Sequence, residues 1–153
     1  MKNRRSLSLT AVLLCISFFF LTIPPRAGGE EYGGGIRTEV LTKSGTASNG
    51  QALRYPCTER PEVTAMIVHI PPGQETGRHY HKIPVLAYVL DGTLTVEIEG
   101  GQTLTFRPGQ VILEVQDTIH NGINRGTVPV KLVVFYVGEE GKPLVYRGEP
   151  SRP

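Results

Sequence analysis

The sequence has little cysteine. Cys15 and Cys57 are the two cysteines among its 153 residues, and Cys15 lies in an N-terminal apolar run that is predicted to be removed. One remaining thiol cannot form an intrachain disulfide, so an apolar core has to hold the fold together. For Cys57, buried packing is the favoured interpretation, and an interchain disulfide or a metal ligand are the alternatives.

Clustered positive charge is also missing. The formal net charge is +2, but four basic residues and no acidic ones lie in residues 1–27, so the rest of the chain carries −2. A mildly acidic domain without a Lys/Arg cluster lacks the electrostatic footprint of a nucleic-acid-binding protein, which excludes DNA and RNA as partners. The sequence shows no Ser-His-Asp order, Gly-rich phosphate loop or close carboxylate pair either.

Residues 1–27 are predicted to form an export signal. Three basic residues among the first five precede an apolar run over residues 7–23, which ends at Pro24-Pro25. This is the charge-then-apolar pattern of a signal peptide, with cleavage expected after Ala27. The apolar run is close to the length that spans a bilayer, so an uncleaved inner-membrane anchor is the alternative. We therefore expect a periplasmic or secreted bacterial protein.

The remaining chain is predicted to be a single all-β domain. Residues 28–35 form a flexible Gly-rich spacer, and residues 36–148 form the domain. Eighteen glycines and twelve prolines, mixed with β-branched residues, favour short strands joined by tight turns over helices. The nine segments predicted as strands are Arg37–Thr42, Ala52–Tyr55, Val63–Ile70, Val85–Leu90, Thr93–Glu99, Thr103–Phe106, Val111–Val115, Ile119–Asn124 and Val130–Val137.

Turn residues separate these segments. Asp91-Gly92 is the strongest hairpin signal, because both residues accept the positive φ of a type I′ turn. Gly100-Gly101 and residues 107–110 predict further reversals, and Asn121-Gly122 predicts the end of a strand. So many short antiparallel strands predict a jelly-roll-like β-barrel, since a flat sheet would leave long exposed edges.

The histidines carry the candidate chemistry. His79 and His81 lie two residues apart on an extended segment, so their side chains point to the same face, about 6.5–7 Å apart at Cα. Two imidazoles in this arrangement can converge on one metal ion.

The surroundings of this pair resemble the two conserved motifs of the cupin superfamily. In the first, the spacing matches at Gly73, both histidines and Gly92. In the second, Gly109 is followed at the right intervals by His120 and Asn124. The resemblance implies a cupin-type antiparallel β-barrel, preceded here by an export signal, with a divalent metal bound by His79, His81 and His120.

The departures from the motifs concern the metal site. Val85 stands where the first motif has glutamate, and Val115 and Asp117 stand where the second has proline and glycine. The usual carboxylate ligand is therefore missing, which predicts a three-histidine site with two or three positions open to water or substrate. The resemblance implies a transition metal, with Fe, Mn, Zn and Ni all open.

Two further residues are candidates beside the three histidines. Glu114 interrupts an apolar run, and strand alternation favours an outward side chain beside Gln116. The alternative hypothesis is an inward Glu114 that replaces the lost carboxylate as a metal ligand. His69 has no companion histidine in its segment, so a core or rim position is favoured over a ligand role. Tyr80, between two ligands, is expected to face away from them.

Two functions are compatible with these residues. The first is a metal-dependent enzyme, for which a dioxygenase of a small molecule is the leading candidate. The second is a non-catalytic cupin module that binds a small molecule or metal, because the cupin fold hosts both kinds of protein. The resemblance also implies a homodimer, to which residues 36–55 would contribute strands.

Overall fold

The computed structural model describes residues 34–150; the predicted export signal and most of the predicted spacer lie outside this range. The chain divides into two units, Met1–Thr38 and Glu39–Pro153, and the strands belong to the second. They are β1 (Pro61–Ile70), β2 (Val85–Asp91), β3 (Leu94–Ile98), β4 (Gln102–Phe106), β5 (Val111–Leu113), β6 (His120–Ile123) and β7 (Val130–Glu139). Among the described residues, no helix could cross a membrane.

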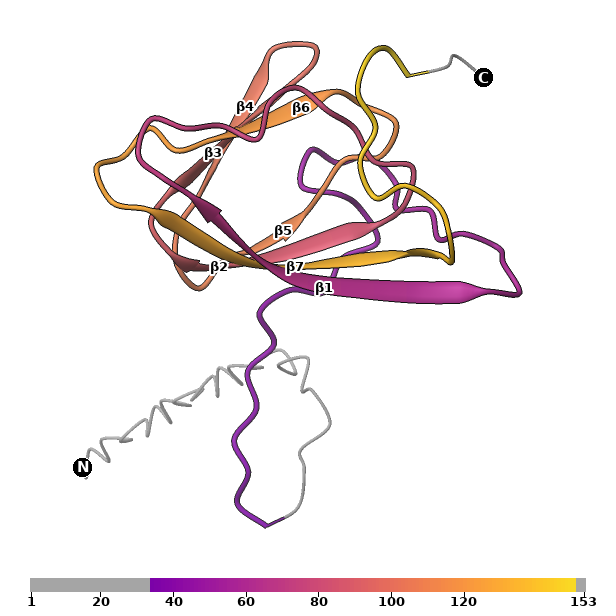
Figure 1. Cartoon of the computed structure of the whole chain (residues 1–153). Helices are drawn as coiled ribbons and strands as arrows, with labels where there is room; N and C mark the ends of the chain where they lie inside the picture. The colour runs from indigo at the N-terminus through magenta and orange to yellow at the C-terminus, as the bar shows by residue number, and fades with distance from the viewer. Residues whose placement is uncertain (1–33, 151–153) are drawn as a thin grey trace, which may run out of the picture. The chain divides into compact units, whose positions relative to one another are not determined.

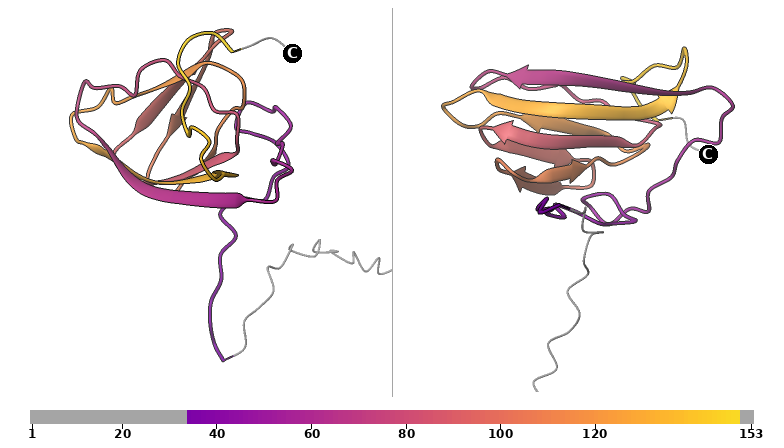
Figure 2. Two further views of the ribbon diagram at one scale, coloured as in Figure 1. Left: turned by 45° about the vertical axis from the view of Figure 1, so that its right-hand side comes forward. Right: turned by 90° about the horizontal axis from the view of Figure 1, so that it is seen from below.

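The strands form two facing antiparallel sheets. One has the order β1-β7-β2-β5 and the other the order β4-β3-β6. Figure 1 shows the two layers, with β1, β2 and β7 below and β3, β4 and β6 above, and Figure 2 shows the four-stranded sheet from its outer side. The predicted all-β jelly-roll barrel is confirmed.

Alternation along the strands builds the core between the sheets. In β3, Leu94, Val96 and Ile98 are buried as expected. In β7, Val134 and its even-numbered neighbours are buried, while the odd-numbered residues face the other side of the sheet. This period of two is what places one row of side chains of each strand between the sheets.

Two of the nine predicted strands are wrong. Residues 37–42 have no regular secondary structure, pair with no strand among the described residues, and have exposed side chains. Residues 52–55 make a single bridge, from Ala52 to Thr46, and otherwise follow the surface. Both segments have strand-like composition, but a strand forms only where a neighbouring backbone offers a ladder of hydrogen bonds.

The Asp91-Gly92 hairpin is also wrong, because β2 and β3 belong to different sheets. The pair makes a corner between the layers instead. Gly92 has a φ of +74°, and a Cβ there would lie 2.6 Å from the Pro129 carbonyl oxygen. Glycine is therefore required by space as well as by backbone conformation.

The other turn predictions have mixed outcomes. Gly100-Gly101 joins the paired strands β3 and β4, as predicted. A hydrogen bond from the Gln110 N–H to the Arg107 carbonyl closes the reversal over residues 107–110. Asn121-Gly122 does not end a strand, because both residues lie within β6. Here glycine leaves room for a neighbour: a Cβ on Gly122 would meet Thr76 at 3.4 Å.

The structure also shows the positions of three residues outside the site for which the sequence analysis made predictions. Cys57 is exposed, so the expectation of buried packing is wrong; it lies on a surface stretch outside the sheets. His69 is exposed on β1, at the rim of the barrel. Tyr80 is buried and stacks on Tyr146, with 5.3 Å between ring centroids.

Candidate metal centre

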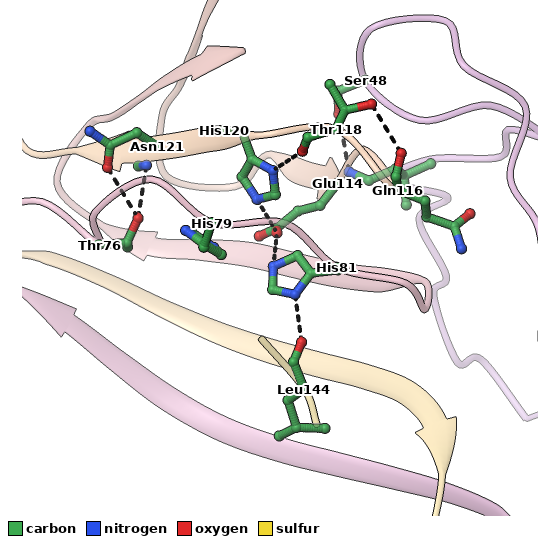
Figure 3. A network of polar contacts seen from close by, with 12 residues as sticks. Ser48, Thr76, His79, His81, Glu114, Gln116, Thr118, His120, Asn121 and Leu144 are labelled. Atoms are coloured by element: carbon green, nitrogen blue, oxygen red, sulfur yellow. Dashed lines mark hydrogen bonds and ion pairs between the residues drawn. The ribbon is translucent and has the colours of Figure 1, made fainter. Parts of the chain in front are cut away.

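Four side chains meet between the two sheets. They come from the segment before β2, from the residue after β5 and from the start of β6, and we call them the ligand cluster: His79, His81, Glu114 and His120 (Figure 3). Each offers one ligand atom, and these atoms all lie within 4.8 Å of one another. The three imidazole centroids are between 4.5 and 5.2 Å apart. The structure thus brings together the three predicted histidines and Glu114.

Backbone pairing positions the histidines. His79 and His120 exchange two backbone hydrogen bonds, of 3.0 and 2.8 Å, across the gap between the first segment and β6. His81 is held next to the chain after β5, because its carbonyl accepts from the Asp117 N–H at 2.8 Å. The cluster is therefore mounted on paired backbone, which limits how far each imidazole can move.

The outer nitrogen of each imidazole is anchored to the backbone. Nδ1 of His79 lies 2.7 Å from the Gly77 carbonyl oxygen, Nδ1 of His81 lies 2.7 Å from that of Leu144, and Nδ1 of His120 lies 3.0 Å from that of Thr118. A carbonyl only accepts, so each Nδ1 must carry the proton and donate. In the neutral imidazoles, each Nε2 is then the nitrogen with a free lone pair, as a metal ligand requires.

Glu114 points into the cluster. Its Oε2 lies 3.0 Å from Nε2 of His81 and 3.2 Å from Nε2 of His120. A carboxylate oxygen facing two lone pairs is repelled by both, unless a proton or a metal ion lies between them. The position of Glu114 therefore requires positive charge at the centre of the cluster.

The expectation of an outward Glu114 is wrong, although the alternation of β5 continues to this residue. Ile112 of β5 packs in the core, and the Glu114 N–H still donates to the Val85 carbonyl at 3.0 Å, so alternation places Glu114 on the inner face together with Ile112. Gln116 is also buried, at 2% exposure, and it pairs with both backbone groups of Arg54. Because Ile112 and Leu113 are both apolar, the sequence pattern did not show which face of this segment is the interior.

The pKa values of the cluster reflect this contact. Burial lowers the pKa of His79 to about 4. Burial also acts to lower that of His120, but the hydrogen bond and charge of Glu114 outweigh it and raise the pKa above its ordinary value. For Glu114, burial acts to raise the pKa, yet the hydrogen bonds and charges of His120 and His81 hold it well below its usual range. Glu114 is thus an anion at neutral pH.

A small cavity of about 60 Å³ opens beside the ligand cluster. A water molecule needs roughly 10–15 Å³ by the same measure, so the cavity has room for a molecule of a few heavy atoms. Its walls are mainly aliphatic side chains from both sheets, and Thr76 and Tyr136 add two hydroxyl groups. Burial, followed by the charge of Glu114, raises the pKa of Tyr136 to about 12, so it stays a neutral donor.

Sequence reasoning did not identify Thr76 and Tyr136 as part of the site. The alternation of β7 carries a signal for Tyr136, because it shares the inner face with Val134. No comparable signal exists for Thr76, which lies in an irregular segment ahead of the histidines and reaches the site through its hydrogen bond from the Gly122 N–H at 3.0 Å.

The remaining motif positions have structural roles. Asn124 is fully buried and donates to the carbonyls of Ile70 and Val128, both at 2.8 Å. Asp117, which replaces a motif glycine, has a φ of +50° and so keeps the left-handed backbone of that position. Val85, in place of the motif glutamate, belongs to the apolar core. The carboxylate of the cluster therefore comes from Glu114, in the second motif, rather than from the first.

Residues 66–136 match the cupin domain family. No curated protein matches the sequence. Among solved structures, a conserved protein with a double-stranded β-helix domain from Klebsiella pneumoniae is 18% identical over 63% of this chain and 91% of its own, with a TM-score of 0.49. A DMSP lyase from Ruegeria pomeroyi is 19% identical over 60% of this chain and 45% of its own, with a TM-score of 0.50. At these identities the likeness concerns the fold alone, and this chain spans less than half of the lyase.

Proposed function

Since the chain belongs to the cupin superfamily, we propose that it is a metal-dependent enzyme that binds one divalent transition metal ion through the ligand cluster and acts on a small molecule in the adjacent cavity. The donor set fits such an ion. Three imidazole nitrogens and one carboxylate oxygen suit Fe, Mn, Zn and Ni alike, and they leave one or two coordination positions open.

The observation that carries the proposal is the contact of Glu114 with two anchored histidines. The backbone carbonyls of Leu144 and Thr118 fix the protons on the outer nitrogens of His81 and His120. The inner nitrogens then need a cation between themselves and the carboxylate. One divalent ion would satisfy all these groups at once, whereas protons would have to be shared among them.

The cavity supports a reaction on a small molecule. When bound, the metal would supply a Lewis acid and an open position for substrate or dioxygen. The chain itself contributes the aliphatic walls, which exclude bulk water, and the Tyr136 hydroxyl, which can donate a hydrogen bond to a bound molecule. Oxidation of a small organic molecule by dioxygen is the reaction class that we propose first.

A non-catalytic binding module is the second candidate, and one observation favours it. Apart from the ligand cluster, Tyr136 is the one ionisable group among the residues that line the cavity. A reaction that needs a separate general acid or base would thus have to use Tyr136 or Glu114.

Metal analysis of protein purified without chelator tests the proposal. We expect about one equivalent of a transition metal, and loss of most of it in His81→Ala. His69→Ala is the matched control, because His69 is exposed and lies outside the cluster. Oxygen consumption by the metal-loaded protein, with a panel of thiols, phenols and diketones, then separates enzyme from binding module. Metal-free protein that takes up none of the four ions would contradict the metal-dependent enzyme and would leave only a module that binds a small molecule without metal.

The proposed location is outside the cytoplasm. The pattern of residues 1–27 supports it, and the anchor over residues 7–23 remains the alternative. Mass spectrometry of the N-terminus, after expression of the whole chain, distinguishes the two: a start near residue 28 in the periplasmic or secreted fraction supports export with cleavage. An intact Met1 in a soluble cytoplasmic fraction would contradict export.

A further inference from the structure

The chain that follows β7 returns to the segment that carries two of the ligand histidines. Tyr80 and Tyr146 exchange two backbone hydrogen bonds, both of 3.0 Å, in an isolated antiparallel bridge. We call residues 144–147 the C-terminal strap and residues 76–82 the ligand segment. The C-terminal strap lies outside residues 66–136, the part of the chain that matches the cupin domain family.

The C-terminal strap anchors one ligand of the cluster directly. The Leu144 carbonyl accepts from Nδ1 of His81 at 2.7 Å (Figure 3). The other two ligand histidines are anchored by the carbonyl of the residue two positions earlier in the chain. His81 depends instead on a carbonyl 63 positions away. Its anchor therefore exists only while the C-terminal strap stays on the ligand segment.

Tyr146 is the main point of attachment of the C-terminal strap. Besides its two backbone hydrogen bonds, its ring stacks on that of Tyr80, with 5.3 Å between centroids and 24° between the ring planes. Nζ of Lys82 lies 5.0 Å from the centre of the Tyr146 ring, in the range of a cation–π contact. These contacts lie on either side of His81 in the sequence, so they hold the strap against the part of the ligand segment that contains this histidine.

Arg147 extends the contact toward the other histidine of the ligand segment. Its Nη2 donates to the Thr76 carbonyl at 3.4 Å, and a Cβ on Gly77 would lie 3.0 Å from its Nη1. The Gly77 carbonyl is the anchor of His79. The C-terminal strap thus follows the ligand segment from Thr76 to Lys82.

We propose that Tyr146 is a positioning residue of the metal centre: by holding the C-terminal strap on the ligand segment, it keeps the Leu144 carbonyl against His81. An imidazole without this acceptor can carry its proton on either nitrogen and can turn about its side-chain bonds. Fixing it again for the metal costs part of the binding free energy. The inference rests on the proposed function, because it concerns the affinity of the ligand cluster for its ion.

The first test needs no metal. NMR of the metal-free, full-chain protein follows the exchange with water of the Nδ1 proton of His81, which is assigned by its loss in His81→Ala. A hydrogen-bonded proton exchanges slowly, so a protected signal is expected. Tyr146→Ala should raise its exchange rate by about tenfold or more, because the strap opens more often. Tyr146→Phe keeps the ring and should restore the wild-type rate.

Two further variants frame this test. Tyr55→Ala is the matched control, since Tyr55 is 65% exposed and lies outside the C-terminal strap, and it should leave the exchange rate unchanged. Lys82→Gln removes only the cation beside the Tyr146 ring, so it should raise the rate by a smaller factor, about two- to threefold. It keeps the proposal testable if Tyr146→Ala fails to fold, which urea unfolding followed by circular dichroism shows.

The second test uses the protein loaded with Co²⁺, whose visible absorption reports the arrangement of its ligands. Tyr146→Ala should weaken Co²⁺ binding by about tenfold, at the lower end of the loss expected for a residue that orients a ligand. It should also shift the visible bands, because one imidazole is less well fixed. Tyr146→Phe should restore both. A merely structural role would lower the urea midpoint and leave the spectrum unchanged.

An unprotected His81 proton in the wild-type protein, or one whose exchange is the same in Tyr146→Ala and Lys82→Gln, would overturn the proposal whether or not the protein binds metal. Wild-type Co²⁺ affinity and spectrum in a folded Tyr146→Ala would overturn it as well. Failure of the proposed function has a different signature: the wild-type protein takes up no metal, while the His81 proton is protected and its protection depends on Tyr146. The C-terminal strap then still orients His81, and the metal function alone is wrong.

Discussion

The two faces of the β1-β7-β2-β5 sheet are built from the same strands but differ in burial: one packs against the second sheet, and the other is partly exposed to solvent. In β7, Val134 and Tyr136 face inward, where the second sheet covers them and the cavity opens beside the ligand cluster. Val133 and Phe135, one residue away in each case, face outward and stay partly or largely exposed. Alternation therefore decides which residues share a face, but both faces are apolar, and only the packing of the second sheet decides which one is the interior.

The largest expected effect comes from placing the same charge on either face. Val134→Asp should lower the free energy of unfolding by about 3–5 kcal/mol, because it buries a carboxylate without a partner. Val133→Asp, one residue earlier, should change it by no more than about 1 kcal/mol at low protein concentration. Urea unfolding followed by circular dichroism measures both. Equal losses in the two variants would show that the outer face is covered within the monomer.

Removal of one cluster histidine should have the next largest effect. His81 is 1% exposed, and its Nε2 lies in the cluster. His81→Ala should weaken metal binding by more than about 100-fold, since even loss of a residue that only orients a ligand costs about 10–100-fold. Competition with a chromogenic chelator gives the affinity. His69→Ala, on the outer side of β1, should leave it unchanged, and a comparable loss in that variant would refute the assignment of the site.

Glu114→Gln tests the inner carboxylate. The amide keeps the size of the side chain but removes the negative charge, so the metal affinity should fall by about tenfold or more. Glu62→Gln is a suitable control, because Glu62 is exposed on β1. If Glu114→Gln binds the metal as tightly as the parent, the site is a neutral three-histidine one, and Glu114 has some other role.

The pH dependence of metal binding should show the smallest and most graded effect. Metal competes with protons for the imidazoles, so the affinity falls when a ligand histidine becomes protonated. His79, with a pKa of about 4, does not limit binding near neutrality. His120 does, because Glu114 raises its pKa above the ordinary value of 6.5. The affinity should therefore decline as the pH falls through the neutral range, by at most about tenfold for each proton displaced per pH unit.

The same titration in Glu114→Gln sharpens the comparison. Without the carboxylate, the pKa of His120 loses the influence that raises it, so the decline should begin at a lower pH than in the parent. Isothermal calorimetry in two buffers of different ionisation enthalpy counts the protons released on binding. Proton release that does not change between the parent and the variant would argue against a direct link between Glu114 and His120.

Much of the site was predictable from the sequence, because its strongest signals are short-range. The His79-x-His81 pair places two imidazoles on one face whatever the rest of the chain does. His120 followed from the spacing of the second cupin motif, and the structure places it against His79 through two backbone hydrogen bonds. The seven strands that form were all among the nine predicted, since their alternation and turn residues are local as well.

The predictions that failed depended on distant neighbours. Residues 37–42 have the composition of a strand but find no partner within residues 34–150, and Asp91-Gly92 has the chemistry of a hairpin but makes a corner between the sheets. In each case the sequence correctly indicated a local backbone preference. Whether that segment paired with another strand, and with which one, depended on which strands lie next to it in the folded protein. Asp117 is the reverse case: it departs from the motif glycine and still keeps the positive φ.

The sequence by itself determined the fold class and the three histidines, because periodicity and motif spacing are properties of the chain alone. The orientation of Glu114 was decided only by the tertiary structure. Alternation in β5 places Glu114 on the same face as Ile112, but Ile112 and Leu113 are both apolar, so only the packing of the two sheets shows that this face is the interior. The carboxylate then reaches His81 and His120, where positive charge compensates for its burial. This compensation of the Glu114 charge involves residues from separate parts of the chain, so no local sequence pattern predicts it.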